Sequence, residues 1–145
     1  MIQKIIDGII AAIRTEYGKP YRIYTESVIQ GLKEPCFSVM CLNPSGEREV
    51  GNRFKRFYPF MISYFPSTDE PVEECNDVCD TLLFLLSDIE TDDGGVHVLG
   101  APSGQIVDGV LHFGIQYQAF ANKYKAPETG MDELITVETN VRRGE

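Results

Sequence analysis

The side chains of this sequence best suited to nucleophilic or metal chemistry are four cysteines and two histidines. A catalytic pair needs a thiol within hydrogen-bond reach of an imidazole, and Cys36 with His112 is conceivable if their strands are neighbours. A surface histidine beside a structural cysteine is the ordinary outcome, since free cysteine behaves as a small hydrophobe. There is no CxxC and no Cys/His cluster at zinc spacing. We therefore expect buried free thiols, and neither a metal nor a cofactor.

Acidic residues of a helix predicted after residue 66 are a second candidate, because carboxylates bind hard cations. Glu73, Asp77 and Asp80 lie close together at helical spacing, but no histidine joins them. A solvated helix face is the simpler interpretation, and such a face suits a basic partner. The loop GAPSGQ at 100–105 is too short for a phosphate-binding loop and lacks its lysine. With no catalytic constellation in view, the sequence indicates a protein that is not an enzyme.

The stretch GNRFKRFYPFMISYFP at 51–66 interleaves cations with aromatic rings, a pattern that nucleic-acid binders also use. Arg53, Lys55 and Arg56 gather at its start, close to Arg48, and the aromatic residues alternate as they would on a strand. A net charge of −9 repels free nucleic acid, and four cations are few for a phosphate-binding groove. We therefore predict that these four cations contact an acidic protein surface.

Charge is unevenly spread along the chain. Residues 1–56 hold nine Lys or Arg against six Asp or Glu, whereas residues 57–122 hold eleven acidic residues and no Lys or Arg. A positive and a negative region on one molecule favour head-to-tail contact between copies. Glu73, Asp77 and Asp80 are the predicted acidic partner face for such a contact.

Hydrophobic periodicity predicts the elements that carry these residues. Isoleucines at helical spacing indicate a helix over 2–17. A second helix follows residue 70, with a predicted buried stripe of Val72, Cys75, Cys79, Leu82, Leu83, Leu86 and Ile89. Strands are predicted at 21–25, 36–42, 47–65, 96–100 and 107–122, with a type I turn at 43–46 and a bulge at Gly51.

The predicted strand at 47–65 has two distinctive features. Both of its faces are apolar over residues 57–65, so we expect a helix or another subunit to cover the second face. Pro59 has no N–H to donate, which favours an edge position or a bulge at that point.

The resulting order is α-β-β-β-α-β-β, an α+β fold with two helices packed on a mixed or antiparallel sheet of four to five strands. We expect one domain over 1–124 and a flexible extension over 125–145, which is polar and has no core pattern. Within the extension LITVETNV is rich in β-branched residues, so Leu134, Ile135 and Val137 are candidates to pair with a sheet edge of another subunit. No apolar run is long enough to span a membrane, so no membrane partner is expected.

Five motifs in this order resemble a family of phage tail terminator proteins, found in tailed phages, prophages and phage-like tail particles. They are GLKEPCF (31–37), LNPS (42–45), GNRFKRFYPFMISYFPS (51–67), EPVEEC (70–75) and IVDGVLHF (106–113). The similarity spans roughly residues 1–124, and it is the joint order of the motifs that is specific.

The resemblance implies a small α/β protein that closes into a ring, usually a hexamer, on the head-proximal end of the tail tube. There it would stop tube polymerisation and present a surface to the head connector or stopper protein. Its partners would be itself, the tube protein and the connector, with DNA passing through the lumen as non-specific cargo. It would assemble in the host cytoplasm and end in the neck of the virion tail. The family has no catalytic residues.

Three other functions fit parts of the sequence. A head-completion or stopper protein of the neck is the nearest, because it belongs to the same structural class. A small enzyme or ligand-binding domain would use the GAPSG loop, and a nucleic-acid binder would use the basic end of the stretch at 51–66.

Overall fold

Two long antiparallel strands form the centre of the computed structural model, which describes residues 1–25, 33–91, 94–125 and 135–138. β4 (Arg53–Phe65) runs beside β9 (Val110–Lys125), with Arg53 opposite Asn122. Both strands alternate between buried and half-buried residues, since only one face of the pair is packed under helices. The buried face of β9 carries the residues predicted from its period of two: Leu111, Phe113, Ile115, Tyr117 and Ala119.

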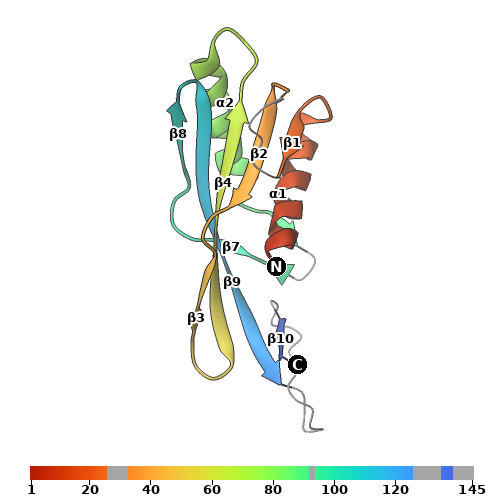
Figure 1. Cartoon of the computed structure of the whole chain (residues 1–145), viewed down its shortest axis with the longest axis vertical. Helices are drawn as coiled ribbons and strands as arrows, with labels where there is room; N and C mark the ends of the chain where they lie inside the picture. Colours follow the sequence, from red (N-terminus) through yellow and green to blue (C-terminus); the bar gives the residue numbers. More distant parts are fainter. Residues whose placement is uncertain (26–32, 92–93, 126–134, 139–145) are drawn as a thin grey trace.

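The other strands lie on either side of this pair in one mixed sheet (Figure 1). β2 (Cys36–Cys41) and β3 (Ser45–Arg48) follow one another along β4, and β1 (Arg22–Tyr24) adds to β2 as a parallel strand. β7 (His97–Val98), β8 (Ser103–Val107) and β10 (Ile135–Glu138) pair with β9. β5 (Glu90–Thr91) and β6 (Gly94–Gly95) form a separate pair. The predicted α+β class is confirmed, although the eight strands of the main sheet in the described residues exceed the four to five expected.

A bulge, and not the predicted type I turn, connects β2 to β3 at residues 42–44. Cys41 lies opposite Phe60 and Ser45 lies opposite Phe57, so three residues of one strand face two of the other. The extra residue is accommodated at Asn43, whose φ of 43° lies in the left-handed region that asparagine tolerates. The sequence NPSG is typical of a turn. Here β2 and β3 both pair antiparallel with β4, so the chain keeps the same direction through these residues.

Pro59 of β4 lies opposite this bulge. Its carbonyl accepts a 2.7 Å hydrogen bond from the N–H of Leu42. Because the N–H and C=O of one strand residue point to the same side, the missing N–H of Pro59 also faces the bulge and not β9. A proline is therefore tolerated in a strand with neighbours on both sides, and the prediction of a bulge at this point is confirmed.

A hairpin replaces the single strand predicted over 47–65. β3 ends at Arg48, and β4 begins at Arg53 after a turn in which the N–H of Arg53 donates to the carbonyl of Val50. Gly51 has a φ of 67°, a conformation that is strained for residues with a side chain. A glycine in a strand pattern marks either a bulge or a turn, and here it marks the turn.

A second hairpin joins β8 to β9, where the sequence predicted a loop at 100–105 followed by one strand from 107. Asp108 and Gly109 have φ values of 52° and 75°, which are the two left-handed residues of a type I′ turn. β8 therefore already begins at Ser103, inside the GAPSGQ segment.

α1 (Ile2–Tyr17) has the predicted bounds. Ile5, Ile9 and Ile13 are completely buried, as expected from their spacing. The helix ends at Gly18, whose φ is 85° and whose N–H donates to the carbonyl of Arg14.

α2 (Pro71–Leu85) buries a face that is rotated from the predicted one. Cys75, Val78 and Leu82 are buried, whereas Val72 and Leu83 are 55% and 40% exposed. The segment has apolar residues on both sides of its buried face, so hydrophobicity alone could not identify the centre of that face. Contact with the sheet decides it.

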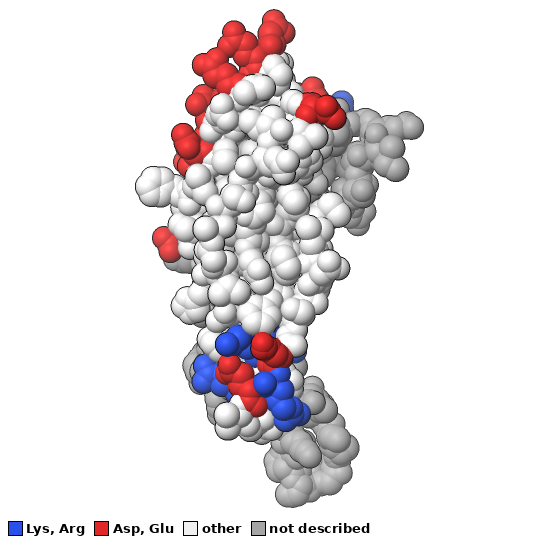
Figure 2. All heavy atoms as spheres, turned by 90° about the vertical axis from the view of Figure 1, so that its left-hand side faces the viewer, with Lys and Arg blue, Asp and Glu red and all other residues white. Residues whose placement is uncertain are grey.

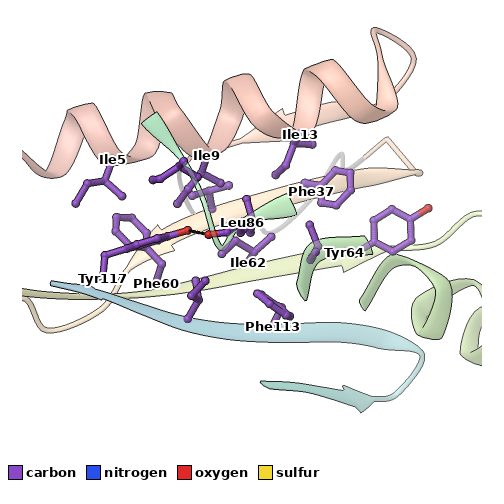
Figure 3. Close-up of a cluster of buried hydrophobic side chains, with 14 of the residues drawn as sticks. Ile5, Ile9, Ile13, Phe37, Phe60, Ile62, Tyr64, Leu86, Phe113 and Tyr117 are labelled. Carbon is purple, nitrogen blue, oxygen red and sulfur yellow. Dashed lines mark hydrogen bonds between the residues drawn. The ribbon is translucent and has the colours of Figure 1, made fainter. Parts of the chain in front are cut away.

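Both helices pack on the same face of the sheet, since their buried residues belong to one core cluster. Figure 3 shows Ile5, Ile9 and Ile13 of α1 directed toward the side chains of this face. The core between them combines isoleucines of α1 with aromatic and branched residues of β2, β4 and β9: Phe37, Val39, Phe60, Ile62, Leu111 and Phe113. Tyr117 is buried among these residues, and its hydroxyl donates a 2.6 Å hydrogen bond to the carbonyl of Leu86. Burial raises the pKa of Tyr117 above its ordinary value, so this hydroxyl stays a donor.

The second face of β4 is lined by Phe57, Met61 and Phe65, all half-buried. Among the described residues neither helix lies on this face, so the predicted helical cover is wrong, and the alternative of cover by another subunit stays a prediction.

The sheet extends beyond the helices, as the lower half of Figure 1 shows. We call this part, residues 45–57 and 118–125 with β10, the arm, and we call the helix-covered remainder the body. The arm consists of the β3–β4 hairpin, the end of β9 and β10.

Candidate functional site

No catalytic or metal constellation forms among the described residues. Within them, no three His, Cys, Asp or Glu side chains are close enough to hold a metal ion. Cys36 and His112 do not meet, because β4 lies between their strands. The Nδ1 of His112 instead forms a 3.2 Å hydrogen bond with the hydroxyl of Ser63 on β4. The described helices include none long and apolar enough to cross a membrane.

The four cysteines are free thiols, as predicted. Cys36 and Cys75 are buried and the other two are half-buried. Burial raises the pKa of all four thiols. The thiol of Cys75 also donates to the carbonyl of Gly109 at 3.7 Å. A thiol with a raised pKa is a poor nucleophile at neutral pH, which fits a packing role.

The predicted acidic residues form an exposed stripe on α2. Glu73, Asp77 and Asp80 are all exposed, and no Lys or Arg of the described residues forms an ion pair with them. A hydrogen bond with Glu70 raises the pKa of Glu73, as expected where carboxylates crowd together. Figure 2 shows acidic side chains dominating this end of the molecule, with an uncharged band between them and the arm.

One carboxylate of α2 has a different role. Glu74 accepts hydrogen bonds from the hydroxyl of Tyr64, from the hydroxyl of Thr68 at 2.7 Å and from the N–H of Thr68 at 3.1 Å. Burial alone would raise the pKa of Glu74, but these bonds outweigh it and lower the pKa. Glu74 therefore ties the start of α2 to the end of β4. The N-cap of α2 is Glu70, which forms no side-chain cap bond.

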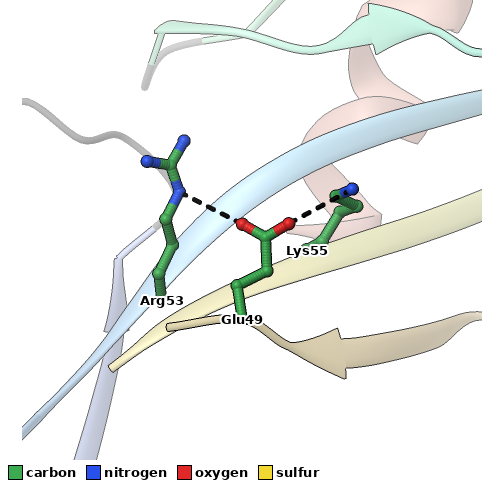
Figure 4. Close-up of polar contacts among 3 residues, drawn as sticks. All are labelled: Glu49, Arg53 and Lys55. Carbon is green, nitrogen blue, oxygen red and sulfur yellow. Dashed lines mark ion pairs between the residues drawn. The ribbon is translucent and has the colours of Figure 1, made fainter. Parts of the chain in front are cut away.

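The predicted basic residues all lie on the arm, but three of them are already engaged within the chain. The carboxylate of Glu49 lies between Arg53, at 3.7 Å, and Lys55, at 3.2 Å (Figure 4). The guanidinium of Arg53 also lies 4.2 Å from the ring centroid of Phe120. Arg48 lies 5.0 Å from the ring centroid of Phe54 and donates to the carbonyl of Gly51. These contacts stabilise the arm.

Arg56 differs from the other three cations. Its guanidinium donates a 3.3 Å hydrogen bond to the hydroxyl of Tyr58, and no carboxylate of the described residues pairs with it. It lies in a groove of about 650 Å³ where the start of α1 meets the arm. Its lining mixes apolar side chains with polar ones and includes Met1, Ile2, Ser45, Arg56 and Tyr58. We call it the arm groove.

Phe84 is the surface residue that sequence reasoning missed. It is 81% exposed on α2, and it borders a groove of about 810 Å³ that Glu16, Asp80 and Leu83 also line. Phe84 lies 4, 7 and 11 residues after Asp80, Asp77 and Glu73, so it continues their stripe on one face of the helix. The sequence does contain a signal for this residue. Phe84 lies among carboxylates on the helix face opposite the predicted buried stripe, where a phenylalanine has no core to enter.

The C-terminal candidates are only partly covered by the structure. Ile135 and Val137 lie in β10, which pairs antiparallel with residues 122–125 of β9 in the same chain. Leu134 lies outside the described residues.

A family model described as phage tail terminator protein matches residues 4–129, which include α2, β1–β9 and all of α1 but its first two residues. The chain belongs to the phage tail terminator family. A search of curated proteins found no match. Membership confirms the resemblance seen in the five motifs, and it makes the chain a structural protein of a phage tail.

Family membership also gives these surfaces a context. A tail terminator is part of the virion tail and interacts with tail and head components. Exposed stripes, grooves and sheet edges are therefore the features that matter in this chain, more than buried thiols or isolated histidines.

Proposed function

We propose that this chain forms a ring of six copies that caps the head-proximal end of the tail tube, stops tube polymerisation and presents a surface to the head connector or stopper. The observation that carries the proposal is the family match over residues 4–129. The ring would assemble in the host cytoplasm and remain at the neck, with DNA as its non-specific cargo.

The charge distribution supports a ring over a two-fold dimer. The acidic stripe of α2 and the cations of the arm lie at opposite ends of the molecule (Figure 2). Each copy can then offer different, complementary surfaces to its two neighbours, which is the arrangement of a heterologous ring.

Tails assembled without this protein test the proposal. Tubes of uncontrolled length are expected, since nothing would stop the addition of tube subunits, and electron microscopy measures their length. Tubes of normal length that fail to join heads would assign the chain to the joining step, as a stopper. Tails of normal length that join heads would overturn the proposal.

We also propose that the arm cations Arg48, Arg53, Lys55 and Arg56 contact a tube subunit or the acidic face of the next copy, formed by Glu73, Asp77 and Asp80. Reversing Arg53 and Arg56 to Glu should abolish capping. The reversal also removes the contacts of Arg53 with Glu49 and Phe120, but exposed pairs of this kind contribute only about 1 kcal/mol each, so the chain should stay folded, which circular dichroism checks. Reversing Lys19 and Arg22, which are exposed outside the arm, is the matched control. Normal capping by the arm variant would remove the arm from the interface.

The domain boundary near residue 124 and the extension at 125–145 remain part of this proposal. We propose that the extension is flexible in the free chain, and that Leu134, Ile135 and Val137 pair with a sheet edge of a neighbouring copy in the particle. β10 lies on β9 of its own chain, so the same strand would be exchanged between copies. Amide exchange around these residues should be fast in the free chain and slow in the particle. Equal protection in both states would assign the strand to its own subunit.

A further inference from the structure

An exposed aromatic side chain next to carboxylates is unusual on a helix whose other face is fully packed. Phe84 is 81% exposed, and Asp80 lies one helical turn before it on the same face. Glu16, at the end of α1, lines the same groove. Covering a phenylalanine removes apolar surface from water, so a partner that buries Phe84 stabilises the contact. Aromatic residues of this kind are also typical anchors of protein interfaces.

The arm groove carries the opposite charge. Its lining includes Met1, Ile2, Pro44 and Tyr58, which can contact an aromatic ring. The cationic side chain of the lining, Arg56, has no carboxylate partner among the described residues. A half-buried guanidinium held by a tyrosine hydroxyl is well placed to receive a carboxylate. The arm groove therefore complements Asp80 in charge and offers apolar side chains to the ring of Phe84.

We propose that the occupant of the arm groove is Phe84 of a second copy of this chain, with Asp80 of that copy paired to Arg56. The contact is heterologous, since the anchor and the groove are different surfaces of one molecule. A repeated contact of this type forms a ring when the rotation between copies closes, as the proposed ring requires. The inference rests on the proposed ring, and it identifies the residues that join neighbouring copies.

Truncation of the anchor gives the first test. Phe84→Ala should raise the concentration of protein needed to cap tube ends about 30-fold, the loss expected for an interface anchor worth about 2 kcal/mol. Val72→Ala is the matched control, because Val72 is 55% exposed on the same helix but does not line the groove beside Phe84. An equal effect of the two substitutions, or none from Phe84→Ala, would overturn the inference.

A charge exchange tests the ion pair. Asp80→Arg and Arg56→Asp should each prevent capping, because like charges would face each other, and the double variant should recover it. Loss of capping in the double variant as well, with the fold intact by circular dichroism, would contradict the pairing.

Crosslinking separates this inference from the proposed function. A chain that keeps Phe84 and carries Leu83→Cys beside it, together with Ser45→Cys in the arm groove, should give a ladder beyond the dimer with a short bismaleimide on tube ends. Each single variant carries the same native thiols and should give none. Dimers from Leu83→Cys alone would mean a two-fold contact and overturn the inference. Capped tubes without a ladder would overturn it too and leave the function standing, whereas failure of the unaltered chain to limit tube length would remove the function itself.

Discussion

The body and the arm belong to one sheet but are stabilised in different ways. In the body, two helices cover the sheet, and side chains such as Ile9, Phe60 and Phe113 are at most 2% exposed. In the arm, neither helix covers the strands, and a ladder of β3, β4 and β9 is reinforced by cations on aromatic rings and by the carboxylate of Glu49. The body depends on burial and the arm on surface contacts.

The comparison changes the interpretation of the basic aromatic stretch. From the sequence alone, its four cations are equally good candidates for contact with a partner. In the structure Arg48, Arg53 and Lys55 hold the arm together, and Arg56 alone lacks a ring or carboxylate contact within the described residues. Positive charge near a predicted interface can therefore be structural, and contacts within the chain must be known before it is assigned to a partner.

The largest expected effect distinguishes a body phenylalanine from an arm phenylalanine on the same strand. Phe113→Ala should destabilise the chain by about 3–5 kcal/mol, because it leaves a cavity in a packed core. Phe120→Ala should cost only about 1–2 kcal/mol, since it removes a half-buried ring and its contact with Arg53. Urea unfolding measures both. Equal losses would mean that the arm is packed like the body.

A close contact of Gly104 with α2 in the body gives the second prediction. A Cβ added at Gly104 would lie 2.6 Å from the sulfur of Cys79 and 3.1 Å from Leu111 Cδ1. Gly104→Ala should therefore destabilise by about 1–3 kcal/mol through overpacking between β8 and α2. Adding Cys79→Ala should restore much of the loss, because it removes the nearer atom. A double variant no more stable than Gly104→Ala would assign the loss to the backbone of β8.

The third prediction concerns the junction of β4 with α2 in the body. The lowered pKa of Glu74 means that its bonds stabilise the fold at neutral pH, and that this contribution is lost as pH falls through the folded-state pKa, below the ordinary value of about 4.3. Glu74→Gln should cost about 1–2 kcal/mol at pH 7, after allowance for solvent screening at this half-buried position.

The stability difference between the unaltered chain and Glu74→Gln should shrink as the pH approaches 3. Urea unfolding at a series of pH values checks this, and the comparison of two variants cancels the titration of other carboxylates. A difference that stays constant with pH would mean that Glu74 acts through packing and not through its charge.

The smallest effect is expected in the arm. Glu49→Gln should cost about 0.2–1 kcal/mol, because the ion pairs with Arg53 and Lys55 join side chains that are 31–50% exposed. The cost should vanish near 1 M salt, where the screening length falls to about 3 Å. Thermal unfolding at low and high salt measures it. A loss of stability that persists in high salt would mean that Glu49 acts through packing, and it would contradict the view that surface charge stabilises the arm.

The parts of the fold that sequence predicted correctly rest on contacts along a single element. The isoleucines of α1 and the alternation from Leu111 to Ala119 each reveal one buried face, because residues three or four apart on a helix, or two apart on a strand, share a side. The predictions that were wrong concern pairing between elements. The turn at 43–46 became a bulge only because β3 continues along β4.

The candidate site divides in the same way. The amino-acid sequence by itself determined the family, the α+β class, and the separation of acidic residues after position 57 from the cations before it, since these follow from residue order and type. Only the tertiary structure decided which cations were engaged and which face of α2 was buried. Both depend on strand register and helix orientation, which bring Phe120 to Arg53 and direct Phe84 into solvent. Such contacts join residues far apart in the chain, so they cannot be predicted from patterns within one helix or strand.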